Sequence, residues 1–300
     1  MIKKECFTAE WIEQVSSELH YNDKNLIEKV IRALSLLEML VKAGCPLVFK
    51  GGTALMLILG KSAHRLSIDI DLICPPGTNI EDYLKSFADF GFINLELVER
   101  KQRDDADIPK SHSKFFYQIA YRNDTDAQSY ILLDVLYEDI HYFRTQQIAI
   151  NCPFIRLEGK PLMVTVPSAE DILGDKLTAF APNTTGIPYY RNGRSCSMEI
   201  AKQLYDVGRL FENVSDLQIT KEAFRKIAVV ELSYRSFGTD IGQVFNDIRQ
   251  TALCISTRGK AGEGDFDLIQ DGIIRVKSFM YKQRYLIDHA IIDAARAAYL

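Results

Sequence analysis

The sequence predicts an α+β fold in which a mixed β-sheet with helices is followed by a helical C-terminal lobe. Segments with alternating apolar and polar residues, the pattern of half-buried strands, are confined to the first half of the chain. From Ser168 onward nearly every segment has the spacing of an amphipathic helix instead. We therefore expect one domain over residues 1–165 and a helical second domain over residues 166–300.

Two helices are expected before the first strand. Thr8, and then Asn22 or Asp23, are residue types that commonly cap helix N-termini. The second cap is followed by apolar residues at helical spacing as far as Gly44, where a helix can end. The first domain should therefore open with a helical pair.

The sheet is expected to follow these helices. A strand over 46–50, a tight turn at Gly51-Gly52 and a short helix over 53–60 come first. Later segments with strand-like or helical patterns complete the domain. The expected strands are 67–74, 94–99, 115–121 and 130–137, with a helix at 80–90. Together they predict a mixed or antiparallel sheet.

The helical domain is expected to begin at a capping box. Ser168 precedes Asp171 at the spacing that lets the serine hydroxyl accept a hydrogen bond from the backbone N–H three residues later. Residues 182–194, rich in Pro, Gly and Asn, interrupt the helical pattern and predict a loop.

Composition and charge exclude several classes of protein. Hydrophobic residues make up 47% of the chain and charged residues 25%, as in ordinary globular proteins. The 6 cysteines form no CxxC pair, which argues against a zinc site and a disulfide framework. Because no apolar run suits a signal peptide or a membrane span, we expect a cytoplasmic protein without a membrane partner. A net charge of -4 disfavours nonspecific coating of nucleic acid but is compatible with a local basic patch for an RNA end.

Asp69 and Asp71 are the first candidates for a functional site. Residues two apart on a strand point to one face and lie about 6 to 7 Å apart at Cα. Carboxylates this close repel each other unless a cation compensates them, and Mg²⁺ prefers such oxygen ligands. Because an Asp-x-Asp pair alone is more often a solvated strand edge, the surrounding sequence decides its interpretation.

A glycine pair lies upstream of these acids. In Lys50-Gly51-Gly52-Thr53 the glycines would let backbone N–H groups approach an anion at a helix N-terminus, where the helix dipole adds partial positive charge. The segment is not a Walker loop, because the GxxxxGK[ST] pattern is absent. A turn that seats phosphates and an acid pair that seats a metal together predict phosphoryl or nucleotidyl transfer.

Four ordered blocks of the sequence resemble the AbiEii/AbiGii toxin family of polymerase-β-like nucleotidyltransferases. They are KGGTAL from Lys50, similar to the family's GGT motif; HRLSIDIDL at 64–72, similar to R-x-S-x-D-x-D-L; the DKLTA segment at 175–179; and AKQLYDV at 201–207. The resemblance covers residues 49–210 and leaves the last third of the chain poorly matched.

The resemblance implies a nucleotidyltransferase-type sheet and roles for individual residues. It implies that Gly52 and Thr53, with Gly51 in the same turn, seat the phosphates of an NTP. It also implies Asp69 and Asp71 as ligands of Mg²⁺. In the helical lobe it implies Lys176 as a triphosphate contact and Asp206 as a catalytic carboxylate. Where the family often has another acid near Asp206, this chain has Gln203.

Asp134 is the expected third acid, both as a metal ligand and as a catalytic residue. It is the only charge within the apolar run 130–137, and a buried carboxylate needs a partner or a metal. Asp134 can take the proton of the acceptor hydroxyl, or Asp206 can do so, and the two remain alternatives.

Arg65 and Ser67 flank the acid pair and are candidates for contact with the triphosphate. Ser67 shares the predicted strand face of Asp69 and Asp71, so its hydroxyl can reach the γ-phosphate. The histidines occur at no recognisable metal or triad spacing, and we assign them no role.

The expected reaction transfers a nucleoside monophosphate from an NTP to a hydroxyl group and releases pyrophosphate. The resemblance implies a tRNA-like RNA acceptor, a toxin role and a separate antitoxin. Arg191 and Arg194, near Tyr189 and Tyr190 in the expected loop, suit an RNA end. The alternatives are transfer to a small-molecule or protein hydroxyl and a catalytically inactive nucleotide-binding module.

Overall fold

The computed structural model describes every residue except 98–108, 122–126, 235–237 and 239. The described residues form two compact units. The first holds the described residues up to Pro167 except His141–Arg144, which join Ser168–Leu300 in the second. The predicted α+β fold is confirmed, because the first unit contains a mixed sheet and the second is helical.

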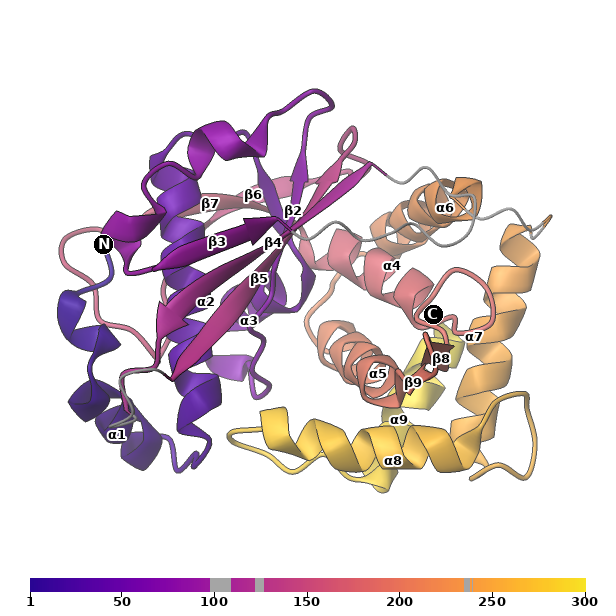
Figure 1. Cartoon of the computed structure of the whole chain (residues 1–300). Coiled ribbons are helices and arrows are strands. Elements are labelled where there is room, and N and C mark those ends of the chain that lie inside the picture. Colours follow the sequence, from indigo (N-terminus) through magenta and orange to yellow (C-terminus); the bar gives the residue numbers. More distant parts are fainter. Residues whose placement is uncertain (98–108, 122–126, 235–237, 239) are drawn as a thin grey trace. The chain divides into compact units, whose positions relative to one another are not determined.

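A 5-stranded sheet of order β1-β2-β5-β4-β3 forms the centre of the first unit (Figure 1). Its strands are β1 (Val48–Lys50), β2 (Ile70–Cys74), β3 (Asn94–Leu97), β4 (Lys110–Gln118) and β5 (Gln128–Tyr137). Because β2 and β5 are parallel while the other neighbours are antiparallel, the sheet is mixed, as predicted.

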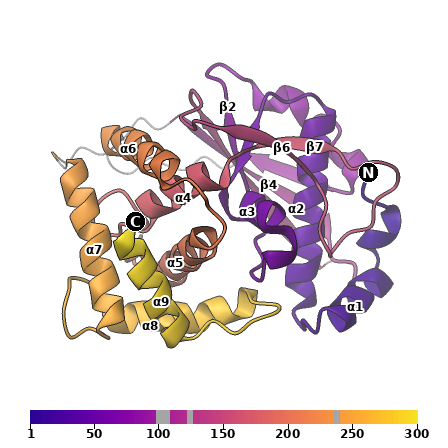
Figure 2. The ribbon, with the colours of Figure 1, turned by 180° about the vertical axis from the view of Figure 1, so that it is seen from behind.

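Helices lie against one face of this sheet, the face seen in Figure 2. The α-helices of this unit are α1 (Ala9–Glu18), α2 (Lys24–Lys42) and α3 (Gly51–Leu59), with 3-10 helices η1 (Lys4–Phe7) and η2 (Gly60–Ser62). The side chains of Thr8 and Asp23 accept hydrogen bonds from backbone N–H groups of the first turns of α1 and α2. The predicted helical pair at the N-terminus is therefore confirmed.

Alternation along the central strands makes one side of the sheet apolar and the other more polar. Leu133 and Val135 on β5 and Leu72 on β2 are buried, whereas Asp71 and Asp134 are only partly buried. The register pairs Leu72 with Val135, and Asp71 with Asp134. Since paired positions share a face, the two acids lie on the same, more polar side.

The predicted helix at 80–90 is wrong. The segment forms two short 3-10 helices, η3 (Ile80–Tyr83) and η4 (Phe87–Phe90). The Asn79 side chain caps its start and a left-handed Gly91 ends it. The Leu84 backbone N–H bonds to the Glu81 carbonyl and ends η3, so the segment does not continue as one α-helix.

Several strand limits also differ from the prediction. β2 begins at Ile70 and not at Ser67. β4 begins at Lys110 and not at Phe115, because its polar first half pairs with β5 without showing apolar alternation. Of the strand expected at 94–99, the last two residues lie outside the described part of the chain. A further antiparallel pair, β6 (Thr145–Ala149) and β7 (Met163–Pro167), was not predicted.

The second unit consists mainly of helices. They are α4 (Ala169–Ala179), α5 (Ser197–Phe211), α6 (Leu217–Ser233), α7 (Ile241–Ser256), α8 (Phe266–Val276), η5 (Lys277–Phe279) and α9 (Ile287–Tyr299). The Ser168 side chain caps α4 by accepting from the Asp171 N–H, as predicted. The Asp171 carboxylate accepts from the backbone N–H groups of Phe143 and Arg144, so it fixes the neighbouring segment to α4. No helix in the described part of the chain is long and apolar enough to cross a membrane.

Candidate active site

Gly51 and Gly52 follow β1 directly and form the start of α3, not the separate turn that the sequence predicted. Gly51 has a φ of +80°, a backbone conformation that favours glycine. A Cβ at Gly51 would overlap the carboxylate of Asp71. A Cβ at Gly52 would lie 2.7 Å from Ser67 Oγ and 2.9 Å from Arg65 Nη2. The glycines therefore let these three side chains reach the N-terminus of α3.

Thr53 connects this helix to the backbone beside the first acid. Thr53 is fully buried, and its Oγ1 donates a hydrogen bond to the carbonyl of Asp69 at 2.7 Å. Asp69 is exposed and lies immediately before β2. Its charge also acts on Lys29 of α2: burial lowers the pKa of Lys29, and the attraction of Asp69 and Asp23 opposes that shift. The described contacts thus give Thr53 a positioning role.

Four polar residues occupy paired positions across the sheet, and we call them the acid row. Lys50 on β1 is paired with Asp71 on β2. Asp71 is paired with Asp134 on β5, and Asp134 with His112 on β4. Paired residues share a face, and neighbouring strands lie about 4.8 Å apart. The structure therefore brings Asp71 and Asp134 side by side, next to Gly51.

His112 is a contact that sequence reasoning missed. Its Nδ1 lies 2.6 Å from Asp134 Oδ1, and the two side chains are 12% and 33% exposed. The hydrogen bond fixes the orientation of the Asp134 carboxylate. The strand predicted from residue 115 was too short to include His112; a strand extended to Lys110 would have placed it opposite Asp134.

The acid row has a donor set that fits Mg²⁺. Within the described ranges, no group of three or more His, Cys, Asp or Glu side chains is arranged to hold a metal ion. Asp71 and Asp134 nevertheless supply two neighbouring carboxylates, and Asp69 lies two residues before Asp71 in the chain. Mg²⁺ is commonly held by one or two carboxylates together with substrate phosphates and water. The two-carboxylate arrangement fits that mode of binding.

Lys176 and Asp206 form a second cluster, within the helical unit. Lys176 Nζ on α4 lies 2.9 Å from Asp206 Oδ2 on α5, and the side chains are 9% and 2% exposed. Lys176 also donates to Gln203 Oε1 at 2.9 Å. Gln203, which stands where the family often has an acid, is therefore a neutral hydrogen-bond partner of Lys176. Lys176 itself is buried and paired, not solvated.

Arg191 and Arg194 lie on a small hairpin of β8 (Tyr190–Arg191) and β9 (Arg194–Ser195), where the sequence predicted a loop. Asn192 and Gly193 have positive φ values of 52° and 74°, as an Asn-Gly hairpin turn requires. Both arginines are exposed and occupy paired positions. Tyr190 is 57% exposed. The hairpin therefore presents two cations and one ring surface.

Tyr189 is less exposed than Tyr190, and burial raises its pKa to about 12. The loop before it is fixed by Asp247, which accepts hydrogen bonds from Asn183 and Thr184. The hairpin is thus joined to α7 through a hydrogen-bonded anchor.

Comparison with known proteins identifies the family. The family profile described as the nucleotidyl transferase AbiEii toxin of type IV toxin–antitoxin systems matches residues 33–280. The fold is similar to that of MenT4, a nucleotidyltransferase toxin from Mycobacterium tuberculosis, with a TM-score of 0.58 and 14% identity over 96% of this chain and 90% of that chain. JHP933 from Helicobacter pylori aligns with a TM-score of 0.46 and 16% identity over 91% of this chain and 93% of that chain. A comparison with curated proteins finds no match. The family match extends over well more than half of the sequence, which confirms the resemblance seen in its motifs: the chain belongs to the AbiEii family of nucleotidyl transferase toxins.

Proposed function

We propose that this protein is a Mg²⁺-dependent nucleotidyltransferase that moves a nucleoside monophosphate from an NTP to a hydroxyl group of RNA. The observation that carries the proposal is the pairing of Asp71 with Asp134 beside the glycine start of α3. These features supply the two requirements of the reaction, which are orientation of a triphosphate and compensation of its charge.

In the proposed reaction, the acceptor oxygen forms a bond to the α-phosphorus while the bond from that phosphorus to pyrophosphate breaks. The residues that would hold Mg²⁺ are Asp71 and Asp134, with Asp69, two residues before Asp71, as a further carboxylate. When bound, the metal neutralises charge on the phosphates. Backbone N–H groups at Gly51 and Gly52 and the helix dipole of α3 favour an anion at the same position. Ser67 and Arg65 lie against Gly52 and can donate to the phosphates.

Lys176 is proposed to contact the triphosphate. An ammonium group has three donors, and Asp206 and Gln203 account for two of them. The remaining donor suits a phosphate oxygen.

Asp134 is the better candidate for the group that takes the proton of the acceptor hydroxyl. Its side chain is 33% exposed, whereas that of Asp206 is 2% exposed and engaged by Lys176. A general base must reach the proton that it removes. Asp206 is then left to position Lys176.

His112 should hold Asp134 in its working orientation. His112→Ala is expected to lower kcat about tenfold or more with a small change in the KM for NTP, because the base loses the partner that orients it. His112→Asn should recover part of the rate, since an amide can also donate to a carboxylate. Steady-state kinetics at saturating RNA measure the effect. A change in KM alone, or no rescue by asparagine, would contradict a positioning role for His112.

The acceptor is proposed to be RNA because of the β8–β9 hairpin. Arg191 and Arg194 together with the exposed Tyr190 offer phosphate contacts beside a stacking surface. The double variant Arg191→Ala/Arg194→Ala should weaken RNA modification and reduce its salt dependence, while NTP binding stays unchanged. The measurement is KM for RNA over a range of salt concentrations. Loss of NTP binding would place the hairpin in the nucleotide site instead, and an unchanged KM for RNA would argue against its role.

The function is tested by incubating the protein with each labelled NTP, Mg²⁺ and total RNA. We expect label on RNA with release of pyrophosphate. Label on protein or on a small molecule would support the alternative acceptors, and no label with any NTP would contradict the enzyme proposal.

As a toxin, the active protein should also arrest growth when expressed without its antitoxin, and the Asp71→Asn variant should not.

A further inference from the structure

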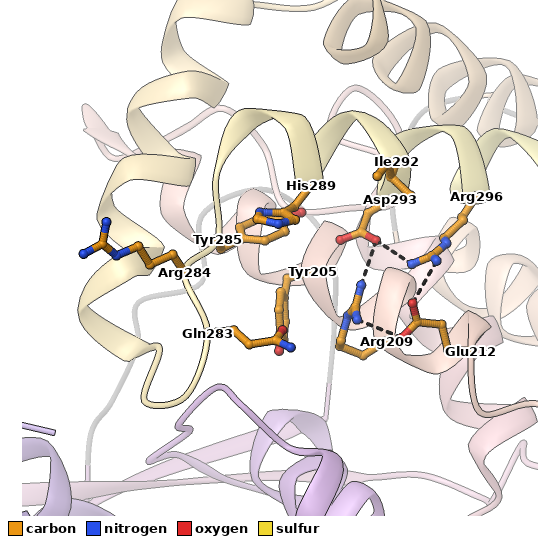
Figure 3. A pocket seen from close by; sticks show the side chains of 10 residues that line it. All are labelled: Tyr205, Arg209, Glu212, Gln283, Arg284, Tyr285, His289, Ile292, Asp293 and Arg296. Carbon is orange, nitrogen blue, oxygen red and sulfur yellow. Dashed lines mark hydrogen bonds and ion pairs between the residues drawn. The ribbon is translucent and has the colours of Figure 1, made fainter. Parts of the chain in front are cut away.

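A pocket of about 440 Å³ lies within the second unit, between α5, α9 and the segment before α9 (Figure 3). Its volume is in the range of small-molecule sites, roughly 300 to 1,000 Å³. Arg209, Glu212, Asp293 and Arg296 line one side, and Arg284 and His289 belong to the rest of the lining. We call it the arginine pocket. It contains none of the residues of the proposed transfer reaction.

An inner carboxylate fixes the two arginines. Asp293 is fully buried and accepts hydrogen bonds from Arg209 Nη2 at 3.2 Å and Arg296 Nη1 at 3.0 Å. Burial raises the pKa of Asp293, and the two arginines oppose that shift. A Cβ at position 208 would overlap the Asp293 carboxylate, so Gly208 is required for this arrangement. Both guanidinium groups are thus held in place before any ligand binds.

An outer carboxylate bridges the same arginines. Glu212 Oε2 lies 2.7 Å from Arg209 Nη1, and Glu212 Oε1 lies 2.8 Å from Arg296 Nη2. Glu212 is 42% exposed, whereas Asp293 is buried. The two arginine side chains are only 19% and 22% exposed, so Glu212 is the exposed member of this ion-pair network, and a side chain at a helix end can turn into solvent. Glu212 is therefore the carboxylate that a competing anion can displace.

The charge of the lining favours an anion once Glu212 has moved. Arg209 and Arg296 then share the single carboxylate of Asp293, which leaves an excess of positive charge. A phosphate group offers each guanidinium an oxygen, as the Glu212 carboxylate does, and arginine binds phosphate with directed hydrogen bonds.

We propose that the arginine pocket binds a nucleotide, whose phosphate replaces Glu212 on Arg209 and Arg296. The pocket is larger than a phosphate group needs. Its lining also includes His289 and Ile292, whose side chains are exposed, Ile292 by 52%. A flat base can pack against an imidazole and an aliphatic side chain. The arginine pocket shares no residue with the acid row, and its proposed ligand does not depend on the proposed transfer reaction.

The test is calorimetric titration with each of the four nucleoside monophosphates and with inorganic phosphate, without Mg²⁺. The protein keeps Asp69 and Asp71, because without Mg²⁺ their carboxylates repel a nucleotide phosphate at the acid row. Adding Glu212→Gln should tighten nucleotide binding about three- to tenfold, because the competing carboxylate is lost. Adding Arg296→Ala should weaken it about tenfold or more, because a charge-assisted contact is lost.

Matched controls come from α8, where Arg275 and Asp271 form an ion pair 2.8 Å long with side chains 54% and 44% exposed. Arg275→Ala and Asp271→Asn should leave binding unchanged. Circular dichroism establishes that each variant is folded. No gain with Glu212→Gln, or an effect equal to that of Asp271→Asn, would overturn the site. Equal affinity for inorganic phosphate and every nucleotide would overturn the nucleotide assignment.

Discussion

Replacement of Asp71 by asparagine is expected to lower the rate of nucleotidyl transfer about 10²- to 10³-fold or more. The substitution preserves the shape of the side chain but removes the negative charge that would hold Mg²⁺ beside Asp134. Asp69→Asn should have a similar effect, because it also removes a carboxylate charge beside the proposed metal. The fold should be unaffected, since Asp69 is exposed and Thr53 bonds to its backbone carbonyl. Release of labelled pyrophosphate measures the rate.

Asp82→Asn provides the matched control for both acids. Asp82 lies on η3, and its side chain is 58% exposed in an ion pair with Lys85. Its replacement should leave transfer unchanged and thereby exclude a general effect of charge. If Asp71→Asn transfers at the normal rate in an assay that requires Mg²⁺, the acid row does not take part in the reaction.

The Lys176–Asp206 pair should contribute to both stability and transfer. Asp206→Asn leaves a lysine 9% exposed without a counter-charge, and we expect a loss of about 3 kcal/mol in the free energy of unfolding. Lys176→Ala should cost about 1 to 3 kcal/mol in kcat/KM for NTP, the range for one charge-assisted hydrogen bond. Urea unfolding and steady-state kinetics measure the two effects.

A double variant separates these contributions. Lys176→Met with Asp206→Leu replaces the buried pair by apolar side chains, so stability should recover to within about 1 kcal/mol of the unmodified protein while transfer stays low. Recovery of both properties would show that the pair is structural only. Unchanged kinetics of Lys176→Ala would likewise count against a triphosphate contact.

The sequence indicated much of the fold because local patterns and the global structure agree. The caps at Thr8, Asp23 and Ser168 have the side-chain hydrogen bonds that their residue types favour. The alternation around Asp71 and Asp134 separates buried from more polar positions, which is why both acids could be placed on a sheet before their pairing was known.

The parts that the sequence did not indicate depend on tertiary contacts. β2 begins after Asp69, not at Ser67, and the Asp69 carbonyl accepts from Thr53, a residue that is distant in sequence. His112 lies in a polar stretch whose strand conformation comes from pairing with β5, so no local periodicity reveals it. Register between distant strands, and hence the partner of Asp134, is not written in any single segment.

Crystallography with Mn²⁺ and a non-hydrolysable NTP gives the most direct measurement, because Mn²⁺ is visible by its anomalous scattering. We predict one anomalous peak between the carboxylates of Asp71 and Asp134, at a distance of about 2.1 to 2.4 Å from a carboxylate oxygen of each, with the triphosphate against the Gly51-Gly52 start of α3. A metal and triphosphate bound elsewhere, with no peak at the acid row, would contradict the proposed site.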